Sequence, residues 1–238
     1  MRHIVATIVL AAGPALSSQP VCAGNWEGSV VATTDYVYRG LSQTYGDPAL
    51  QVDLHYRFAT GWFAGLWASN IDRRPGDRGT YELNGYAGWS RQFGPDWNAR
   101  LTYLRFMYPD SPRGTDYDYD EFQASVSYRD RAFATIGWSP DTTQYSTAGY
   151  AENRRTLSYE LALRQPVAAS LALTGGVAYY DLHDLFDASY WSSNLVLSYT
   201  HGPWEMDVSR FWTGGSASEL YGDEVSGDRW VATLVWRF

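Results

Sequence analysis

The sequence predicts a transmembrane antiparallel up-and-down β-barrel of about 12 strands, with short turns at one end and longer loops at the other. Three observations predict it: an apolar N-terminal segment, alternation of apolar and polar residues along many short stretches, and connections that alternate between short and long.

Residues 1–23 predict a cleaved signal peptide. Arg2 gives a basic start, an apolar run extends from Ile4 to Leu16, and the small residues that end at Ala23 suit a signal peptidase. The run is shorter than the roughly 20 residues that a spanning helix needs, which argues against a membrane anchor. Cys22 is the only cysteine, so the barrel domain, residues 24–238, offers no thiol for disulfides, metal ligation or nucleophilic catalysis.

The composition of residues 24–238 excludes several classes of protein. The segment has 17 Arg, no Lys and 26 Asp and Glu, a formal net charge of −9, so it lacks the basic cluster of a nucleic-acid-binding protein. No stretch approaches 18 consecutive apolar residues, which excludes a helical membrane protein. Aromatic residues make up 16% of the chain while its mean hydropathy is only −0.35. A barrel reconciles these values, because only every second residue faces lipid.

Period-two alternation marks the strands. In residues 50–58 five apolar residues interleave four polar ones, and residues 121–128, 157–163 and 204–209 repeat the pattern. The predicted strands are 26–39, 49–58, 62–70, 81–91, 97–108, 119–128, 132–138, 154–165, 170–180, 190–200, 204–211 and 228–238. An even number of strands with short periplasmic turns leaves both termini of the barrel on the periplasmic side.

Tryptophan positions indicate two interfacial girdles. Three tryptophans open strands after short turns, and four lie beside long loops; these are Trp62, Trp97 and Trp204, and Trp138, Trp191, Trp212 and Trp230. The alternative is a soluble β-sandwich, which also alternates apolar and polar residues. A sandwich would have to bury most of the 11 Trp in a domain of modest size, and strands of about 10 residues are long for that fold.

The C-terminal strand is the sharpest local signal. Apolar residues occupy every second position back from the terminal phenylalanine. This phasing predicts an insertion signal read by the barrel assembly machinery, with Trp230, Leu234, Trp236 and Phe238 as its residues.

Assigning the lipid face from the clean strands leaves a charged lumen. The predicted pore-lining residues are Glu27, Asp35, Arg39, Asp53, His55, Arg57, Glu82, Arg100, Glu121, Glu160, Arg164, Glu205 and Asp207. Acids outnumber arginines eight to four in this set, which predicts a mild cation preference. The alternative is that opposite charges pair across the lumen and brace the wall, since a barrel of this size lies between filled and open ones.

No set of residues predicts catalysis or a cofactor. The run Thr115 to Glu121 is rich in carboxylates, but it lacks the spacing of a calcium loop and is read as a solvated loop entering a strand. If that loop folded inward, its acids would constrict the pore. Asp181 and His183 have the spacing in which a carboxylate orients a histidine, with Asp116 and Asp118 as a conceivable second pair. Such steps arise by chance in loops rich in Asp, so the prediction is that the protein is not an enzyme and binds no metal or cofactor.

Residues 29–51 carry a family resemblance. The run from Asp35 to Gln43, Asp-Tyr-Val-Tyr-Arg-Gly-Leu-Ser-Gln, is followed by Gly-Asp-Pro-Ala at residues 46–49, and the likeness continues more loosely through residues 61–70. This pattern resembles the opening of the TorF family of porins, also called Gcw_chp. The resemblance implies an outer-membrane location and a channel role, and it carries over no functional residues.

The sequence therefore predicts a narrow, mildly cation-preferring channel for small hydrophilic solutes in the outer membrane of a Gram-negative bacterium. Lipid and lipopolysaccharide would surround it, and nucleic acid would not be a partner. Two alternatives stay open: a non-conducting structural or binding barrel, and an outer-membrane hydrolase.

Overall fold

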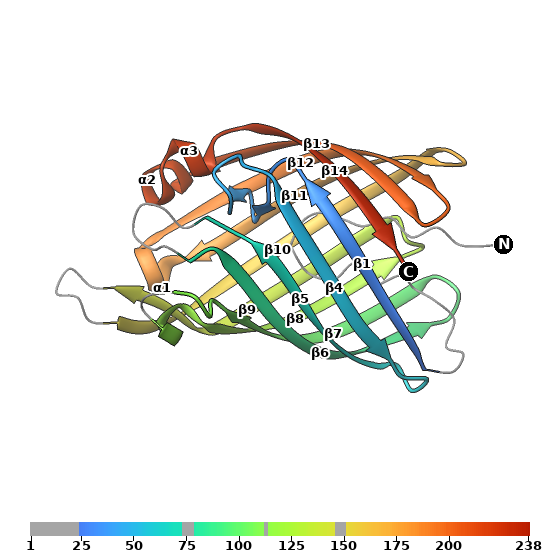
Figure 1. Ribbon diagram of the computed structural model, residues 1–238, viewed down its shortest axis with the longest axis horizontal. Helices are drawn as coiled ribbons and strands as arrows, with labels where there is room; N and C mark the ends of the chain where they lie inside the picture. Colours follow the sequence, from blue (N-terminus) through green and yellow to red (C-terminus); the bar gives the residue numbers. More distant parts are fainter. Residues whose placement is uncertain (1–23, 73–78, 112–113, 146–150) are drawn as a thin grey trace.

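The computed structural model describes residues 24–72, 79–111, 114–145 and 151–238 (Figure 1). The predicted signal peptide, residues 1–23, lies outside the described residues. The wall strands are β1 (Asn25–Thr33), β4 (Ala49–Arg57), β5 (Trp62–Asn70), β6 (Tyr81–Phe93), β7 (Trp97–Met107), β8 (Tyr119–Tyr128), β9 (Ala132–Tyr145), β10 (Ala151–Ala168), β11 (Leu171–Leu182), β12 (Ala188–His201), β13 (Trp204–Gly215) and β14 (Arg229–Arg237).

These 12 strands form one closed antiparallel barrel, which confirms the predicted fold class and strand number. Each strand pairs with its neighbour in the chain, and β1 closes the sheet by pairing with both β4 and β14. In the closed barrel each wall strand is paired on both sides. A lipid environment requires such pairing, because lipid cannot hydrogen-bond to free backbone groups. The two remaining strands, β2 (Val37–Tyr38) and β3 (Leu41–Ser42), form a separate two-stranded sheet.

Alternating side chains give the wall an apolar outer face and a polar inner face. On β4 the outward Leu54 is 44% exposed, whereas the inward Asp53 and His55 are 5% and 4% exposed. Large apolar side chains are exposed on the outer face all around the barrel, including tryptophans near both ends of the strands. An apolar outer band flanked by aromatic residues is what a membrane-spanning barrel presents to lipid.

The inside-outside phase of two strands could not be read from the sequence. On β5, Phe63 and Trp67 point inward and Leu66 is exposed. On β11, Thr174 and Tyr180 point inward while Val177 and Tyr179 are exposed.

The two ends of the barrel differ. One end, here called the short-turn end, has tight connections near residues 58–61, 94–96, 129–131, 169–170 and 202–203. The other, the long-loop end, carries the helices, α1 (His183–Phe186), α2 (Ala217–Tyr221) and α3 (Asp223–Ser226), as well as the 3-10 turn Gly114–Tyr117 (Figure 1). Within the described ranges, no helix has the length and apolar character needed to cross a membrane.

The first predicted strand was too long. The sequence predicts 26–39, but β1 ends at Thr33 and the chain then leaves the wall. Residues 36–38, Tyr-Val-Tyr, favour a strand, and two of them form β2, which pairs with β3 and not with the wall.

The strands around residue 139 were predicted too short. β9 extends to Tyr145 and β10 runs from Ala151, whereas the sequence predicts strands that end at residue 138 and begin at 154. Pro140 lies in the connection that the sequence predicts between these strands. The ladder instead shifts register between Arg154 and Thr156, and such an irregularity accommodates a proline that cannot donate to its neighbour.

Candidate functional site

The interior of the barrel is the candidate site, and the predicted charged residues lie there. Those on wall strands occupy inward positions and are buried or half-buried: Glu27, Asp53, His55, Arg57, Glu82, Arg100, Glu121, Glu160, Arg164, Glu205 and Asp207. Asp35 and Arg39 are also inside, but they belong to a segment that the sequence assigned to the wall. That segment organises the site.

Residues 35–44, here called the inward hairpin, fold into the barrel from the long-loop end between β1 and β4. Its strands β2 and β3 are joined by Arg39 and Gly40, which both have positive φ, 54° and 78°. Two left-handed residues between paired strands form a type I′ turn. A left-handed arginine costs of order 1 kcal/mol or more, so contacts around it must hold it in place.

Arg39 reaches the wall at β8 and β10. Its Nη2 donates to both carboxylate oxygens of Glu121, at 2.7 and 2.8 Å, and to the Oγ of Ser158 at 3.1 Å. Its guanidinium also lies over the rings of Tyr38 and Tyr180. Burial opposes the charge of Arg39, but the carboxylates nearby, Glu121 first, more than offset it and raise the pKa of the guanidinium above its ordinary value.

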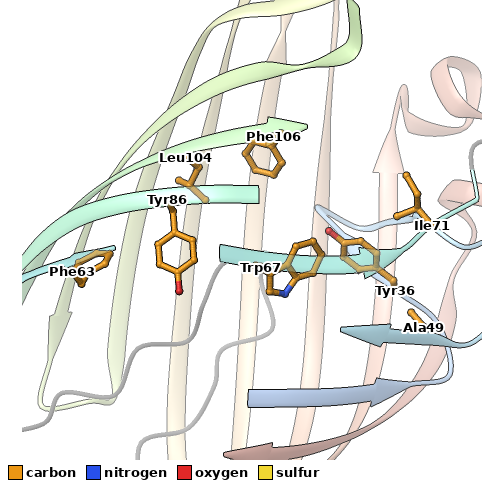
Figure 2. Close-up of a cluster of buried hydrophobic side chains, with 8 residues drawn as sticks. All are labelled: Tyr36, Ala49, Phe63, Trp67, Ile71, Tyr86, Leu104 and Phe106. Carbon is orange, nitrogen blue, oxygen red and sulfur yellow. The ribbon is translucent and has the colours of Figure 1, made fainter. Parts of the chain in front are cut away.

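Asp35 anchors the base of the inward hairpin. Its carboxylate accepts hydrogen bonds from Ser42 Oγ at 2.6 Å and Thr44 Oγ1 at 2.9 Å, and it pairs with Arg229 Nη1 of β14 at 2.7 Å. Next to it, Tyr36 packs on Trp67 of β5, with ring centroids 5.5 Å apart. Figure 2 shows Tyr36 beside Trp67 in the buried apolar cluster that joins the hairpin segment to β5, β6 and β7.

A second polar network occupies the short-turn half of the lumen on β1, β4 and β6. His55 lies between two carboxylates, with Nδ1 2.7 Å from Asp53 Oδ1 and Nε2 3.3 Å from Glu27 Oε2. Tyr86 donates to the other oxygen of Asp53 at 2.6 Å, and Arg57 lies 3.4 Å from Glu27. This network joins side chains of three strands across that part of the wall.

Two inward arginines were missed in the sequence. Arg229 pairs with Asp35, and Arg237 donates to Glu205 Oε1 at 3.1 Å. Both lie on β14 at positions that alternate with the outward Trp230 and Trp236. The phasing of that strand could have identified them. With these two arginines the excess of acids in the interior is smaller than the predicted eight to four.

The acidic run from Thr115 to Glu121 does not fold inward as a unit. Asp118 accepts from the backbone N–H of Tyr108 at 2.9 Å, and Asp120 lies 3.2 Å from Arg105 on the outer face of β7. Of the acidic residues in this run, Glu121 points into the lumen, where it binds Arg39. In the ranges that the structure covers, no three or more His, Cys, Asp or Glu side chains gather as metal ligands would.

The histidine pair considered for catalysis is exposed. His183 Nδ1 lies 3.5 Å from Asp181 Oδ1 and 3.1 Å from Ser189 Oγ. Both contacts fall on the same ring nitrogen. A serine–histidine–aspartate relay needs the two partners on opposite nitrogens.

Solved structures of bacterial channels share this fold. The NanC porin aligns with a TM-score of 0.58 at 10% identity, over 87% of this chain and 97% of that chain. The COG4313 outer membrane channel from Pseudomonas putida F1 aligns at 0.56 and 11% identity, over 99% and 100%. The KdgM porin aligns at 0.54 and 9% identity, over 89% and 99%. At these identities the likeness concerns the fold alone.

No curated protein sequence matches this chain. Residues 18–236 match the family described as "Bacterial protein of unknown function (Gcw_chp)". The match includes the inward hairpin and nearly the whole barrel, and the name TorF is not part of that description. The chain therefore belongs to the Gcw_chp family.

Proposed function

We propose that the protein is an outer-membrane porin of a Gram-negative bacterium, a narrow channel for small hydrophilic solutes with a mild cation preference. The observation that carries the proposal is a closed barrel with an apolar outer face and a charged interior. Polar and charged side chains in the wall of a pore can replace part of the hydration shell of a passing ion. The channels that share the fold support it.

The short-turn end faces the periplasm and the long-loop end the outside, as is usual for such barrels. Lipid and lipopolysaccharide contact the outer face, and the barrel assembly machinery inserts the chain after removal of residues 1–23.

Glu205 and Asp207 on β13 are the proposed origin of the cation preference. Both are buried, at 0% and 2% exposure, and they point to the same side of the strand. Ser198 lies opposite Asp207 in the ladder and hydrogen-bonds to its carboxylate, and Arg237 donates to Glu205. Two neighbouring carboxylates with one arginine partner give this part of the wall a negative charge, and such a charge favours cations in the lumen.

The pore is tested by single-channel recording of the purified, refolded protein in planar bilayers. Discrete conductance steps are expected, because charged and polar side chains from most wall strands line the interior. Folded protein that gives no steps above the background would exclude the porin function.

The cation preference is tested with Asp207→Asn, which keeps the shape of the side chain and removes its charge. Reversal potentials in a KCl gradient should indicate cation preference for the wild type and move toward zero for the variant. Asp187→Asn is the matched control, because Asp187 is exposed at the long-loop end in a left-handed conformation that asparagine tolerates. An anion-selective wild type, or equal shifts in both variants, would contradict the assignment.

The inward hairpin favours one second function, a non-conducting barrel whose interior is filled and whose loops bind other envelope components. The same recordings distinguish it from a channel. Hydrolase activity has less support, given the contacts of His183.

A further inference from the structure

The inward hairpin contacts the wall on three sides. Tyr36 belongs to the apolar cluster on β5, β6 and β7, and Tyr38 packs against the same cluster, 5.9 Å from the Phe106 ring. Leu41 is buried with Tyr180 and Tyr190 of β11 and β12. Val37 is buried with Phe211 of β13 and Val231 of β14. A segment that packs in all these directions narrows the cross-section of the barrel at its level.

Polar contacts fix the same segment at points far apart on the wall. Arg39 binds Glu121 on β8 and Ser158 on β10. The carbonyl oxygens of Arg39 and Gly40 accept hydrogen bonds from Tyr190 Oη at 3.1 Å and Thr213 Oγ1 at 2.8 Å. Asp35 pairs with Arg229 on β14. Buried hydrogen bonds and ion pairs of this kind are costly to break singly, so the hairpin is fixed in position.

Two glycines provide the space for the tip. A Cβ atom on Gly40 would lie 2.6 Å from Ser192 Cβ and 2.6 Å from Thr213 Oγ1. A Cβ atom on Gly137 of β9 would lie 3.2 Å from both the Arg39 guanidinium and the Glu121 carboxylate. The wall is therefore shaped to receive this turn and this arginine.

We propose that the inward hairpin is the constriction that sets the size limit of the channel, and that Arg39 sets the charge at it. This inference rests on the proposed porin function. Inorganic ions and solutes of a few heavy atoms would pass beside the hairpin, and trisaccharides would not. The Arg39 guanidinium neutralises Glu121 and so limits the cation preference at the narrowest level.

The size limit is tested by replacing residues 34–48 with an Asn-Gly turn. Thr33 and Ala49 are paired in the ladder, so two residues can join β1 to β4. The replacement should raise single-channel conductance several-fold. Proteoliposomes that carry it should swell in raffinose, a neutral trisaccharide that the wild type excludes. Faster migration of unheated protein in SDS gels verifies that each variant has folded.

Gly40→Ala tests the same idea without a deletion. Its methyl group collides with Ser192 and Thr213. The turn at residues 39–40 must therefore move away from the wall, and conductance should rise because the constriction is displaced. Gly46→Ala is the matched control. Gly46 lies outside the hairpin and also has positive φ, 83°, so the backbone strain is similar, but nothing lies within 4 Å of its Cβ position. Conductance should stay at the wild-type value.

Arg39→Gln tests the charge. Glu121 would lose its cation, and the reversal potential should move toward stronger cation preference. Arg155→Gln, which removes an exposed arginine, should leave the reversal potential unchanged.

The outcomes separate this inference from the porin function. A conducting wild type whose conductance and raffinose exclusion are unchanged by the Asn-Gly turn would overturn the constriction and leave the porin standing. A silent wild type with a conducting Asn-Gly variant would support the hairpin as the obstruction and overturn the porin. If both folded proteins are silent, both proposals are wrong.

Discussion

Arg229 joins three parts of the molecule through one guanidinium. Besides its ion pair with Asp35, it donates to the backbone carbonyls of Glu224, Val225 and Gly227, which belong to α3 or directly follow it. The charge of Asp35, itself buried, thus has one cation and two hydroxyl donors. Removing the cation from a buried carboxylate leaves a charge without its partner, which destabilises the folded state.

Arg229→Gln should therefore destabilise the hairpin. Removing one partner of a buried pair costs about 3 kcal/mol, and the two hydroxyls reduce that figure here. The measurement is limited trypsinolysis of the folded protein, since Arg39 is the only Lys or Arg in residues 34–48. The wild type should resist cleavage after Arg39, and the variant should be cut there.

Arg155→Gln is the control for this change. Arg155 forms an exposed ion pair with Asp184, and such pairs contribute roughly 0 to 1 kcal/mol. Equal protection of Arg39 in both variants and the wild type would show that the Asp35–Arg229 pair does not hold the hairpin.

At the scale of elements, β14 combines two roles on opposite faces. Its inward arginines bind Asp35 and Glu205, while Trp230, Leu234, Trp236 and Phe238 are all exposed on the outer side. The backbone of Phe238 also exchanges two hydrogen bonds of 3.0 Å with Gly28 of β1. The insertion signal predicted from the sequence therefore lies on an accessible face, and its backbone helps to close the barrel.

Phe238→Ala separates these roles, because it removes the ring and keeps both backbone hydrogen bonds. Refolding into detergent micelles should proceed nearly as in the wild type. Assembly into the outer membrane of a Gram-negative host should fall severalfold, as measured by the amount of folded protein in membrane fractions. A similar loss in both experiments would assign the ring to stability and not to recognition.

Strands were predictable wherever the alternation of apolar and polar residues matched both an extended backbone and the two faces of the barrel wall. β5 and β8 have the predicted boundaries, since both begin and end beside clear turn signals. β1 was predicted too long because Tyr36, Val37 and Tyr38 favour a strand, although they belong to the hairpin inside the barrel. Strand propensity does not report which sheet a strand joins.

At the scale of the whole molecule, the predicted barrel is confirmed, because alternation, connection lengths and an even strand count are all properties of the sequence. The arrangement inside it could not be predicted. Arg39 and Glu121 are 82 residues apart, and Asp35 and Arg229 are 194 apart. No local pattern indicates such a pairing. The motif at residues 35–43 was visible as a family resemblance, but its role as the inward hairpin depends on the closed wall around it.

The closure of the barrel also imposes an order on its assembly. The hairpin follows directly on β1, the first strand, and its contacts reach β14, the last. β1 and β14 share only five registered pairs, fewer than the nine between β1 and β4. Once that seam forms, the ring of strands is complete, and the hairpin can enter only through the long-loop end. Its contacts with β13 and β14 require those C-terminal strands to be in place, so the N-terminal turn gains its full set of contacts only when the chain has completed its wall.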